Sequence, residues 1–142
     1  MTIAELTEFQ KTEKSTRRNA HAEDDHQATV IAWARLNERK LPALRWLFHI
    51  PNGGKRDARE AARLQRQGVI AGVADLFLPY PSREYHGLFI ELKAEGGKPT
   101  DRQREFLAGM TSRGYCAQVA VGSKAAIELI EWYLQRCKEV SK

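Results

Sequence analysis

The 142-residue sequence has few cysteines: only Cys116 and Cys137 are present, with no Cys-x-x-Cys motif and no Cys/His cluster. This scarcity excludes a zinc finger, a thioredoxin-like site and a disulfide framework. The sequence also lacks any apolar run near the ~20 residues of a membrane span, and its first residues lack the apolar stretch of a secretion signal. We therefore expect one globular domain in the cytoplasm, without a membrane partner.

Lysine and arginine outnumber aspartate and glutamate, 23 to 18, which gives a net charge of +5. Residues 1–25 hold four basic and six acidic side chains, so residues 26–142 carry a net charge of +7. Such a basic domain favours a polyanionic partner, although it also fits a ribosome-associated or membrane-peripheral protein. The composition changes near residue 22, which predicts a flexible N-terminal leader over residues 1–22 and a folded domain over residues 23–142.

Hydrophobic periodicity, capping residues and turn residues predict alternating helices and strands. Helices are expected from Asp24 or Asp25 to a point before Pro42, over 57–67, from Thr100 to Thr111 and over 123–138. Strands are expected over 43–50, 73–80, 87–93 and 115–121, and the second and third of these form an antiparallel hairpin. The pattern predicts an α/β domain with a mixed central sheet flanked by helices.

Two acidic residues of the predicted hairpin are placed to face each other. Asp75 and Glu91 each lie eight residues from Arg83, the middle of the connection. Symmetric pairing would bring their Cβ atoms to about 4.5–5.5 Å from each other. Lys93 follows Glu91 by two residues, so both side chains project from the same face of the strand. The hairpin is therefore expected to gather two carboxylates and one ammonium group.

Two carboxylates in an apolar setting repel each other unless a cation or a proton lies between them. A shared Mg²⁺ or Mn²⁺ ion would remove the conflict and would support phosphodiester hydrolysis, with Lys93 holding water or offsetting charge in the transition state. The alternative is structural: Asp75 only begins a strand, and Glu91 and Lys93 form an exposed ion pair. The short Glu-x-Lys pattern alone favours this alternative.

Several other motifs have both a functional and a structural interpretation. The Pro51-Asn52-Gly53-Gly54 turn exposes backbone N–H groups to a phosphate or simply reverses the chain. Thr100-x-x-Gln103 matches a capping box that begins a helix. On the helix over 57–67 and just before it, basic residues form a stripe that tracks a phosphate backbone or is a solvated charged face. Its members, at spacing i, i+3, i+7 and i+10, are Arg56, Arg59, Arg63 and Arg66.

Two stretches of the chain together carry a resemblance to a known family. They read HIPNGGKRDAREAARLQRQGVIAGVADLFLPY and GLFIELKAEGGKPTDRQREFLAGMTSRGYCAQVAVG. Together with the Glu-x-x-x-Gln pair before them, these stretches resemble the VRR-NUC family of PD-(D/E)xK nucleases, in its stand-alone phage or bacterial type. The resemblance extends from about Glu23 to about Leu134. One departure is Ala74, where the family usually has proline. The matching residues are Glu23, Gln27, the Pro-Asn-Gly-Gly turn, Gly68, Gly72 to Asp75, Ile90 to Lys93, Gln103, Gly114 and Tyr115.

The resemblance implies a restriction-endonuclease-like core and a metal-dependent DNA endonuclease. By this resemblance Asp75 and Glu91 bind Mg²⁺ or Mn²⁺ with help from the Leu92 carbonyl, and Lys93 activates water. Glu23 would support the metal through water, although an acid in a first helical turn also complements the helix dipole. Gln103 would contact water or phosphate near the active site, as an alternative to its capping role.

The resemblance also implies DNA contacts, and a branched substrate such as a four-way (Holliday) junction. A homodimer would place two active sites on such a junction, in a bacterial cell or a phage-infected host. The histidines show no metal-ligand spacing, and His49 is the exception to consider because it lies near the turn. The alternatives are a non-catalytic basic nucleic-acid-binding module and a nuclease acting on flap, single-stranded or RNA substrates. The candidate DNA contacts are Asn52, Gly53, Gly54, Lys55, Arg56, Arg59, Arg63 and Arg66.

Overall fold

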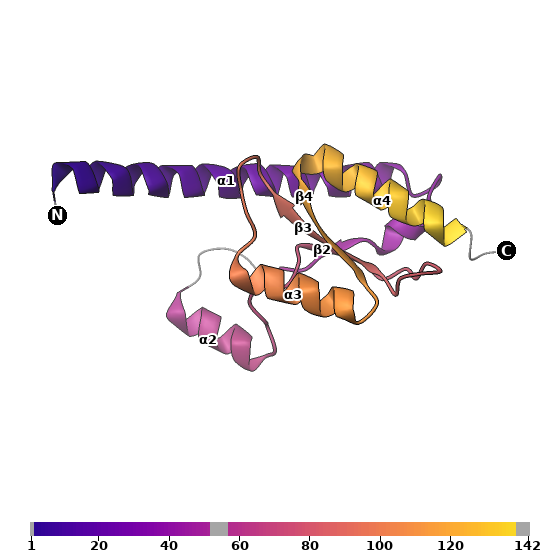
Figure 1. The fold of residues 1–142 in the computed structure, drawn as a ribbon. Coiled ribbons are helices and arrows are strands. Elements are labelled where there is room, and N and C mark those ends of the chain that lie inside the picture. The colour runs from indigo at the N-terminus through magenta and orange to yellow at the C-terminus, as the bar shows by residue number, and fades with distance from the viewer. Residues whose placement is uncertain (1, 52–56, 139–142) are drawn as a thin grey trace.

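A four-stranded sheet with the strand order β1-β2-β3-β4 lies at the centre of the molecule (Figure 1). The computed structural model describes residues 2–51 and 57–138. The sheet is mixed and helices flank it, so the predicted fold class is confirmed. The elements in chain order are α1 (Ile3–Leu36), the 3₁₀ helix η1 (Pro42–Trp46), β1 (Phe48–His49), α2 (Ala58–Arg66), β2 (Leu76–Leu78), β3 (Leu88–Lys93), α3 (Asp101–Ser112), β4 (Cys116–Val121) and α4 (Gly122–Lys138).

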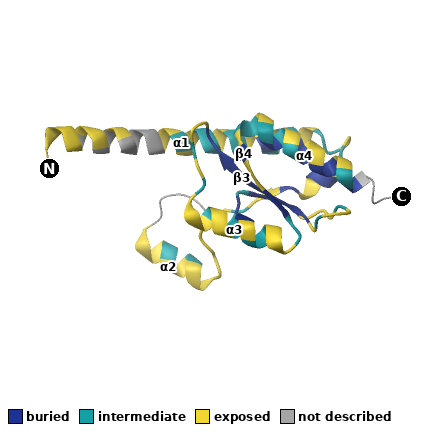
Figure 2. Cartoon of the chain, viewed as in Figure 1, coloured by how far each residue is buried: buried dark blue, intermediate teal, exposed yellow. Residues whose placement is uncertain are grey.

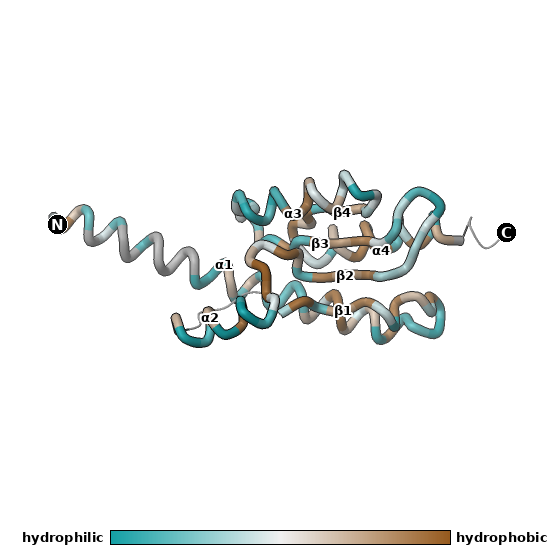
Figure 3. The backbone as a smooth tube through the Cα atoms, turned by 90° about the horizontal axis from the view of Figure 1, so that it is seen from below, coloured by the Kyte–Doolittle hydropathy of each residue, from teal (hydrophilic) through white to brown (hydrophobic). Residues whose placement is uncertain are grey.

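The register of the hairpin is the one that the sequence predicts. β2 pairs antiparallel with β3, and Leu76 and Leu78 face Ile90 and Leu88, respectively. This pairing is symmetric about Arg83, and extending the same register by one residue would set Asp75, which immediately precedes β2, opposite Glu91. β1 pairs antiparallel with β2 and β4 pairs parallel with β3, which makes β3 an interior strand (Figure 3).

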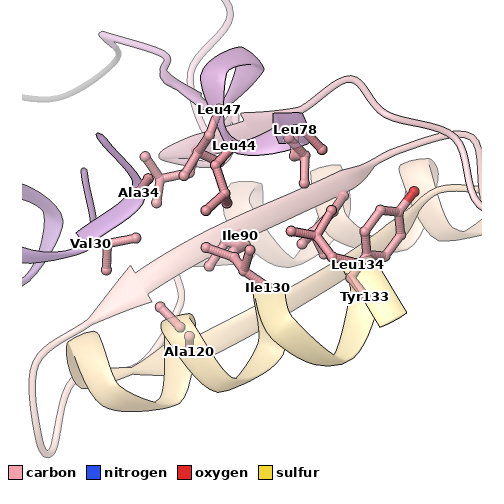
Figure 4. Packing of buried hydrophobic residues seen from close by; sticks show 14 of the residues in the cluster. Val30, Ala34, Leu44, Leu47, Leu78, Ile90, Ala120, Ile130, Tyr133 and Leu134 are labelled. Atoms are coloured by element: carbon pink, nitrogen blue, oxygen red, sulfur yellow. The ribbon is translucent and has the colours of Figure 1, made fainter. Parts of the chain in front are cut away.

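Each face of the sheet is covered by helices, and all six residues of β3 are buried (Figure 2). Side chains alternate along a strand, so Leu88, Ile90 and Leu92 enter one core while Phe89 enters the other. The larger core packs η1, α1 and α4 against the sheet (Figure 4). Its members from outside β3 include Val30, Ala34, Leu44, Leu47, Leu76, Leu78, Ala120, Ile130, Tyr133 and Leu134.

The second core, between the sheet and α3, is built on aromatic rings that cross the strands. The rings of Phe48 on β1 and Phe77 on β2 meet edge to face, with centroids 5.8 Å apart. Phe77 stacks on Phe89 of β3 at 4.2 Å, and Phe89 meets Phe106 of α3 edge to face at 5.1 Å. This row of rings ties the edge strand β1 to the middle of the sheet.

Helix α1 begins much earlier than the sequence predicts. It starts at Ile3, behind a capping box formed by Thr2 and Glu5, so the predicted start at Asp24 or Asp25 is wrong. The N-terminal part of α1 projects beyond the sheet (Figure 1), and the described side chains before residue 19 are exposed. A helical segment whose described side chains are exposed needs no apolar stripe, so hydrophobic periodicity did not reveal it. Among the described residues, no helix is both long and apolar enough to cross a lipid bilayer.

The strand predicted over residues 43–50 is also mostly wrong. Residues 42–46 form η1, and only Phe48 and His49 pair as a strand. Pro42 occupies the first turn of η1, where its fixed φ angle and missing N–H group are tolerated. The alternation of Trp46 and Phe48 suggested a strand with one buried face, yet both side chains are exposed.

Candidate active site

A cavity of about 310 Å³ gathers residues that are far apart in the sequence. It lies where the α1 helix, the turn before β2, the strand β3 and the first turn of α3 meet. Four of the five predicted catalytic residues line it, and the fifth, Lys93, contacts two of those four. The lining residues are Ala20, Glu23, Asp24, Gln27, His49, Gly72, Val73, Asp75, Glu91, Leu92 and Gln103.

Asp75 is held in place by hydrogen bonds from two neighbouring strands. Its Oδ2 atom accepts a hydrogen bond of 2.7 Å from the backbone N–H of Leu92. Its backbone carbonyl accepts one of 2.8 Å from the N–H of Ile50, and Nδ1 of His49 lies 2.8 Å from the same oxygen. Burial raises the pKa of Asp75, while the Leu92 N–H group, Lys93 and His49 act in the opposite direction. The carboxylate is therefore fixed in position and partly desolvated.

Glu91 is a buried acid, with only 1% of its surface exposed. Its Oε1 atom lies 3.3 Å from Nζ of Lys93. Its Oε2 atom is buried and has no hydrogen-bond partner among the described residues. The pKa of Glu91 is raised to about 8, first because burial disfavours the charged form and second because Asp75 carries a negative charge. While Glu91 keeps its proton, it shares a side-chain hydrogen bond with Asp75. Once ionised, its Oε2 atom has no donor among the described residues, unlike most buried polar atoms.

Lys93 lies between two carboxylates. Its Nζ atom is 3.3 Å from Oε1 of Glu91 and 4.0 Å from Oε1 of Glu23 on α1. Only 7% of Lys93 is exposed, so the structural alternative of an exposed Glu91–Lys93 pair is wrong. α1 therefore contributes an acid to the site, as the Glu-x-x-x-Gln motif suggested, and Gln27 lines the cavity one turn further along the helix.

The donor set fits a hard divalent cation. Mg²⁺ and Mn²⁺ prefer oxygen ligands, and protein sites for Mg²⁺ use one or two carboxylates together with water and substrate phosphate. The described residues contain no group of three or more His, Cys, Asp or Glu side chains arranged to hold a metal by themselves. The two acids Asp75 and Glu91, with one oxygen unpartnered, match this open kind of site better than a closed structural one.

Gln103 caps helix α3 and also lies at the cavity. Its Oε1 atom accepts a hydrogen bond of 2.8 Å from the backbone N–H of Thr100, whose hydroxyl accepts one from the N–H of Gln103. The predicted capping box is therefore confirmed, and Gln103 also lines the cavity. The backbone of Gly72, before β2, lies very close to the first turn of α3. Its φ is +91°, and a Cβ atom there would lie 2.7 Å from the carbonyl carbon of Arg102.

The basic stripe lies on a helix that is separate from both cores. α2 has no buried residue, as Figure 2 also shows, and Asp57 caps its N-terminus. Arg59, Arg63 and Arg66 are exposed on it, and none of them forms an ion pair with another described residue. The remaining candidate DNA contacts lie outside the described residues; they are Asn52, Gly53, Gly54, Lys55 and Arg56.

Among the residues that line the cavity, His49 had weak support from the sequence. Its ring reaches the backbone of Asp75 because β1 pairs with β2 so that His49 faces Leu76. In the sequence, only the nearby turn set His49 apart. Its contact with Asp75 depends on the pairing of β1 with β2, which brings together two residues that are 26 positions apart in the chain.

The mixed sheet with its facing acids and buried lysine defines a nuclease-type α/β fold. The model of the VRR-NUC domain family matches residues 10–124, and the chain belongs to this family. A solved structure described as a VRR_NUC domain protein is 32% identical in sequence. The match covers 80% of this chain and 88% of that one, with a TM-score of 0.69. The comparison with curated proteins gave no match.

Proposed function

We propose that this VRR-NUC protein is a metal-dependent DNA endonuclease that hydrolyses phosphodiester bonds and prefers branched DNA such as four-way junctions. The observation that carries the proposal is the state of Glu91: a buried carboxylate beside a second acid, with one oxygen unpartnered. Without a cation, Glu91 keeps a proton that relieves its repulsion with Asp75, and a divalent cation can take the place of that proton. Membership of a nuclease-type family supports the same conclusion.

In this proposal Asp75 and Glu91 bind Mg²⁺ or Mn²⁺, with the carbonyl of Leu92 as a third oxygen. A bound ion of this kind polarises the phosphodiester and lowers the pKa of a coordinated water. The hydrogen bond from the Leu92 N–H group keeps Asp75 oriented toward the cavity before any ion arrives. The protein thereby supplies a preorganised pair of ligands.

Lys93 acts on the reacting water and on the charge of the transition state. Its ammonium group is held by Glu91 and Glu23, so it cannot swing out to solvent without losing both partners. A positive charge fixed in a desolvated site stabilises developing negative charge on phosphate oxygens. Glu23 orients Lys93 and supports the metal through water, and Gln103, which also lines the cavity, contacts water or phosphate.

DNA would reach the site along α2 and the segment that precedes it. The exposed arginines Arg59, Arg63 and Arg66 would contact successive phosphates, which position a nucleic acid without reading its sequence. A two-fold symmetric substrate such as a four-way junction calls for two symmetric cuts. We therefore propose a homodimer with one active site in each chain.

The test measures cleavage of linear duplex, flap, four-way-junction, single-stranded DNA and single-stranded RNA, each with Mg²⁺, with Mn²⁺ and with EDTA. We expect cleavage only with a divalent ion and the highest rate on the junction. Asp75→Asn, Glu91→Gln and Lys93→Ala should each lower the rate at least about 100-fold. Glu95→Gln, on the exposed turn after β3, is the matched control and should cleave normally.

Two readouts separate this proposal from the competing ones. Calorimetric titration with Mn²⁺ should show binding to the wild type and to Glu95→Gln, but not to Asp75→Asn. Tight DNA binding without cleavage under any condition would indicate a non-catalytic nucleic-acid-binding module. Faster cleavage of the flap, single strand or RNA than of the junction would reassign the substrate while leaving the chemistry in place.

A further inference from the structure

Two large aromatic side chains are exposed on the segment that leads into the active site. Trp46 is 52% exposed and Phe48 is 45% exposed. Trp46 and Phe48 lie three residues and one residue before His49, which lines the cavity. Phe48 projects from the opposite face of β1 to His49, and it pairs with Phe77, two residues after Asp75. Since consecutive Cα atoms are 3.80 Å apart, the Cα atom of Trp46 lies within about 11 Å of that of His49.

The backbone that carries Trp46 is fixed on both sides by one arginine. The guanidinium group of Arg35 on α1 donates hydrogen bonds to the carbonyls of Leu44 (3.0 Å) and Leu47 (2.8 Å). Leu44 and Leu47 are themselves buried in the larger core, at 0% and 1% exposure. The indole is therefore presented to solvent from a rigid base, so that binding a ligand requires little ordering of the protein.

The chemistry around the two rings suits a nucleotide. The guanidinium carbon of Arg45 lies 4.7 Å from the centroid of the Trp46 ring, which places a positive charge beside an aromatic face. Phe48 is the exposed end of the row of rings that crosses the sheet through Phe77. Proteins that bind single-stranded nucleic acid combine stacking rings with cations that contact the backbone.

We propose that Trp46 and Phe48, assisted by Arg45, stack unpaired bases of the substrate next to the scissile bond. This inference rests on the proposed nuclease function and refines it. In a continuous duplex the bases are already stacked on each other, so their faces are not accessible to these rings. The branched substrate would therefore present unpaired nucleotides beside the cut, as at the opened centre of a junction.

The chain contains a matched control for this pair. Trp132 on α4 is also exposed, at 39%, and the guanidinium carbon of Arg136 lies 3.7 Å from its ring centroid. Trp132 is associated with Tyr85 and not with the cavity, so it tests whether any exposed tryptophan–arginine pair binds DNA.

The experiment measures affinity by fluorescence anisotropy for a labelled single-stranded oligonucleotide and for a duplex of equal length, in EDTA so that no cleavage occurs. Trp46→Ala combined with Phe48→Ala should weaken binding of the single strand at least about tenfold, and at least about fivefold more than binding of the duplex. Trp46→Phe should retain most of the affinity, and Trp132→Ala should match the wild type. Thermal denaturation confirms that each variant is folded.

Equal losses for the two DNAs, or a double variant that behaves like Trp132→Ala, would overturn the proposal. A shift from dimer to monomer in Trp46→Ala, measured by sedimentation, with unchanged affinity for the single strand, would show that a second copy of the chain covers these rings and would also overturn it. Because binding is measured without metal, the result stands apart from the nuclease proposal, which fails on its own if the wild type cleaves no substrate.

Discussion

At the scale of single residues, Glu91 is the group whose ionisation most affects the metal-free protein. Its pKa in the folded chain is about 8, against 4.5 for the ordinary side chain. Between these values the folded protein keeps a proton that the unfolded chain releases. The stability contributed by Glu91 is therefore fully present below about pH 4.5 and is lost as the pH rises toward 8.

We expect Glu91→Gln to become more stable relative to the wild type as the pH rises from about 5 to about 8, in EDTA. Where one full proton separates the folded from the unfolded state, the free energy of unfolding changes by about 1.4 kcal/mol per pH unit, and solvent screening narrows the pH range over which this holds. Urea denaturation at several pH values measures this difference. Glu95→Gln is the control and should track the wild type, and a Glu91→Gln difference that is flat across the range would refute a raised pKa.

The sequence was enough to predict most of the residues that gather at the candidate site. Asp75 and Glu91 could be paired by counting from Arg83, because a hairpin fixes the register of its two strands. The position of Lys93 followed from the alternation of strand side chains. His49 and Arg35 could not be placed in this way, since their contacts depend on how η1 and β1 pack against α1 and β2. Such packing has no short-range signature in the sequence.

At the scale of elements, prediction succeeded where an element packs against the cores or has a clear cap. α3 carries the capping box at Thr100, α2 has its cap at Asp57, and both begin within one residue of the expected position. The described side chains before residue 19 of α1 are exposed and left no periodic apolar signal, so the start of the helix was missed by about 20 residues. The alternating apolar residues near Trp46 suggested a strand with a buried apolar face. The side chains of Trp46 and Phe48 are exposed instead, so their alternation did not indicate burial.

The first turn of α3 offers a test of whether Gln103 is only a cap. Thr100→Ala should lower the free energy of unfolding by about 1 kcal/mol, because one capping hydrogen bond is lost. Gln103→Ala should cost a similar amount, and it should also slow cleavage at least about tenfold because Gln103 lines the cavity. Chemical denaturation and single-turnover cleavage measure the two effects.

A further variant separates stability from chemistry at this position. Gln103→Glu keeps an oxygen that accepts from the Thr100 N–H group, so it should restore the stability that Gln103→Ala loses. Equal slowing of cleavage in Thr100→Ala and Gln103→Ala would show that Gln103 acts only by fixing the helix end.

At the scale of the whole molecule, the excess of positive charge is unevenly placed. α2 lies apart from both cores, is hydrophilic (Figure 3) and presents Arg59 and Arg63 one turn apart. A helix without buried residues contributes little to the fold by packing, so its sequence is free to serve binding. Because phosphate contacts release counterions, their number can be read from the salt dependence of DNA affinity.

The double variant Arg59→Ala with Arg63→Ala should bind DNA more weakly, and its plot of log affinity against log salt should be shallower by about 1.8, because each lost phosphate contact removes about 0.9. The matched control replaces two exposed arginines away from α2: Arg83 in the β2–β3 connection and Arg113 at the end of α3. This control has the same net charge, so it separates local contacts from the field of the whole protein. If both variants change the slope equally, α2 is not the surface that follows the phosphates, and the DNA must approach the Asp75–Glu91 pair from another side.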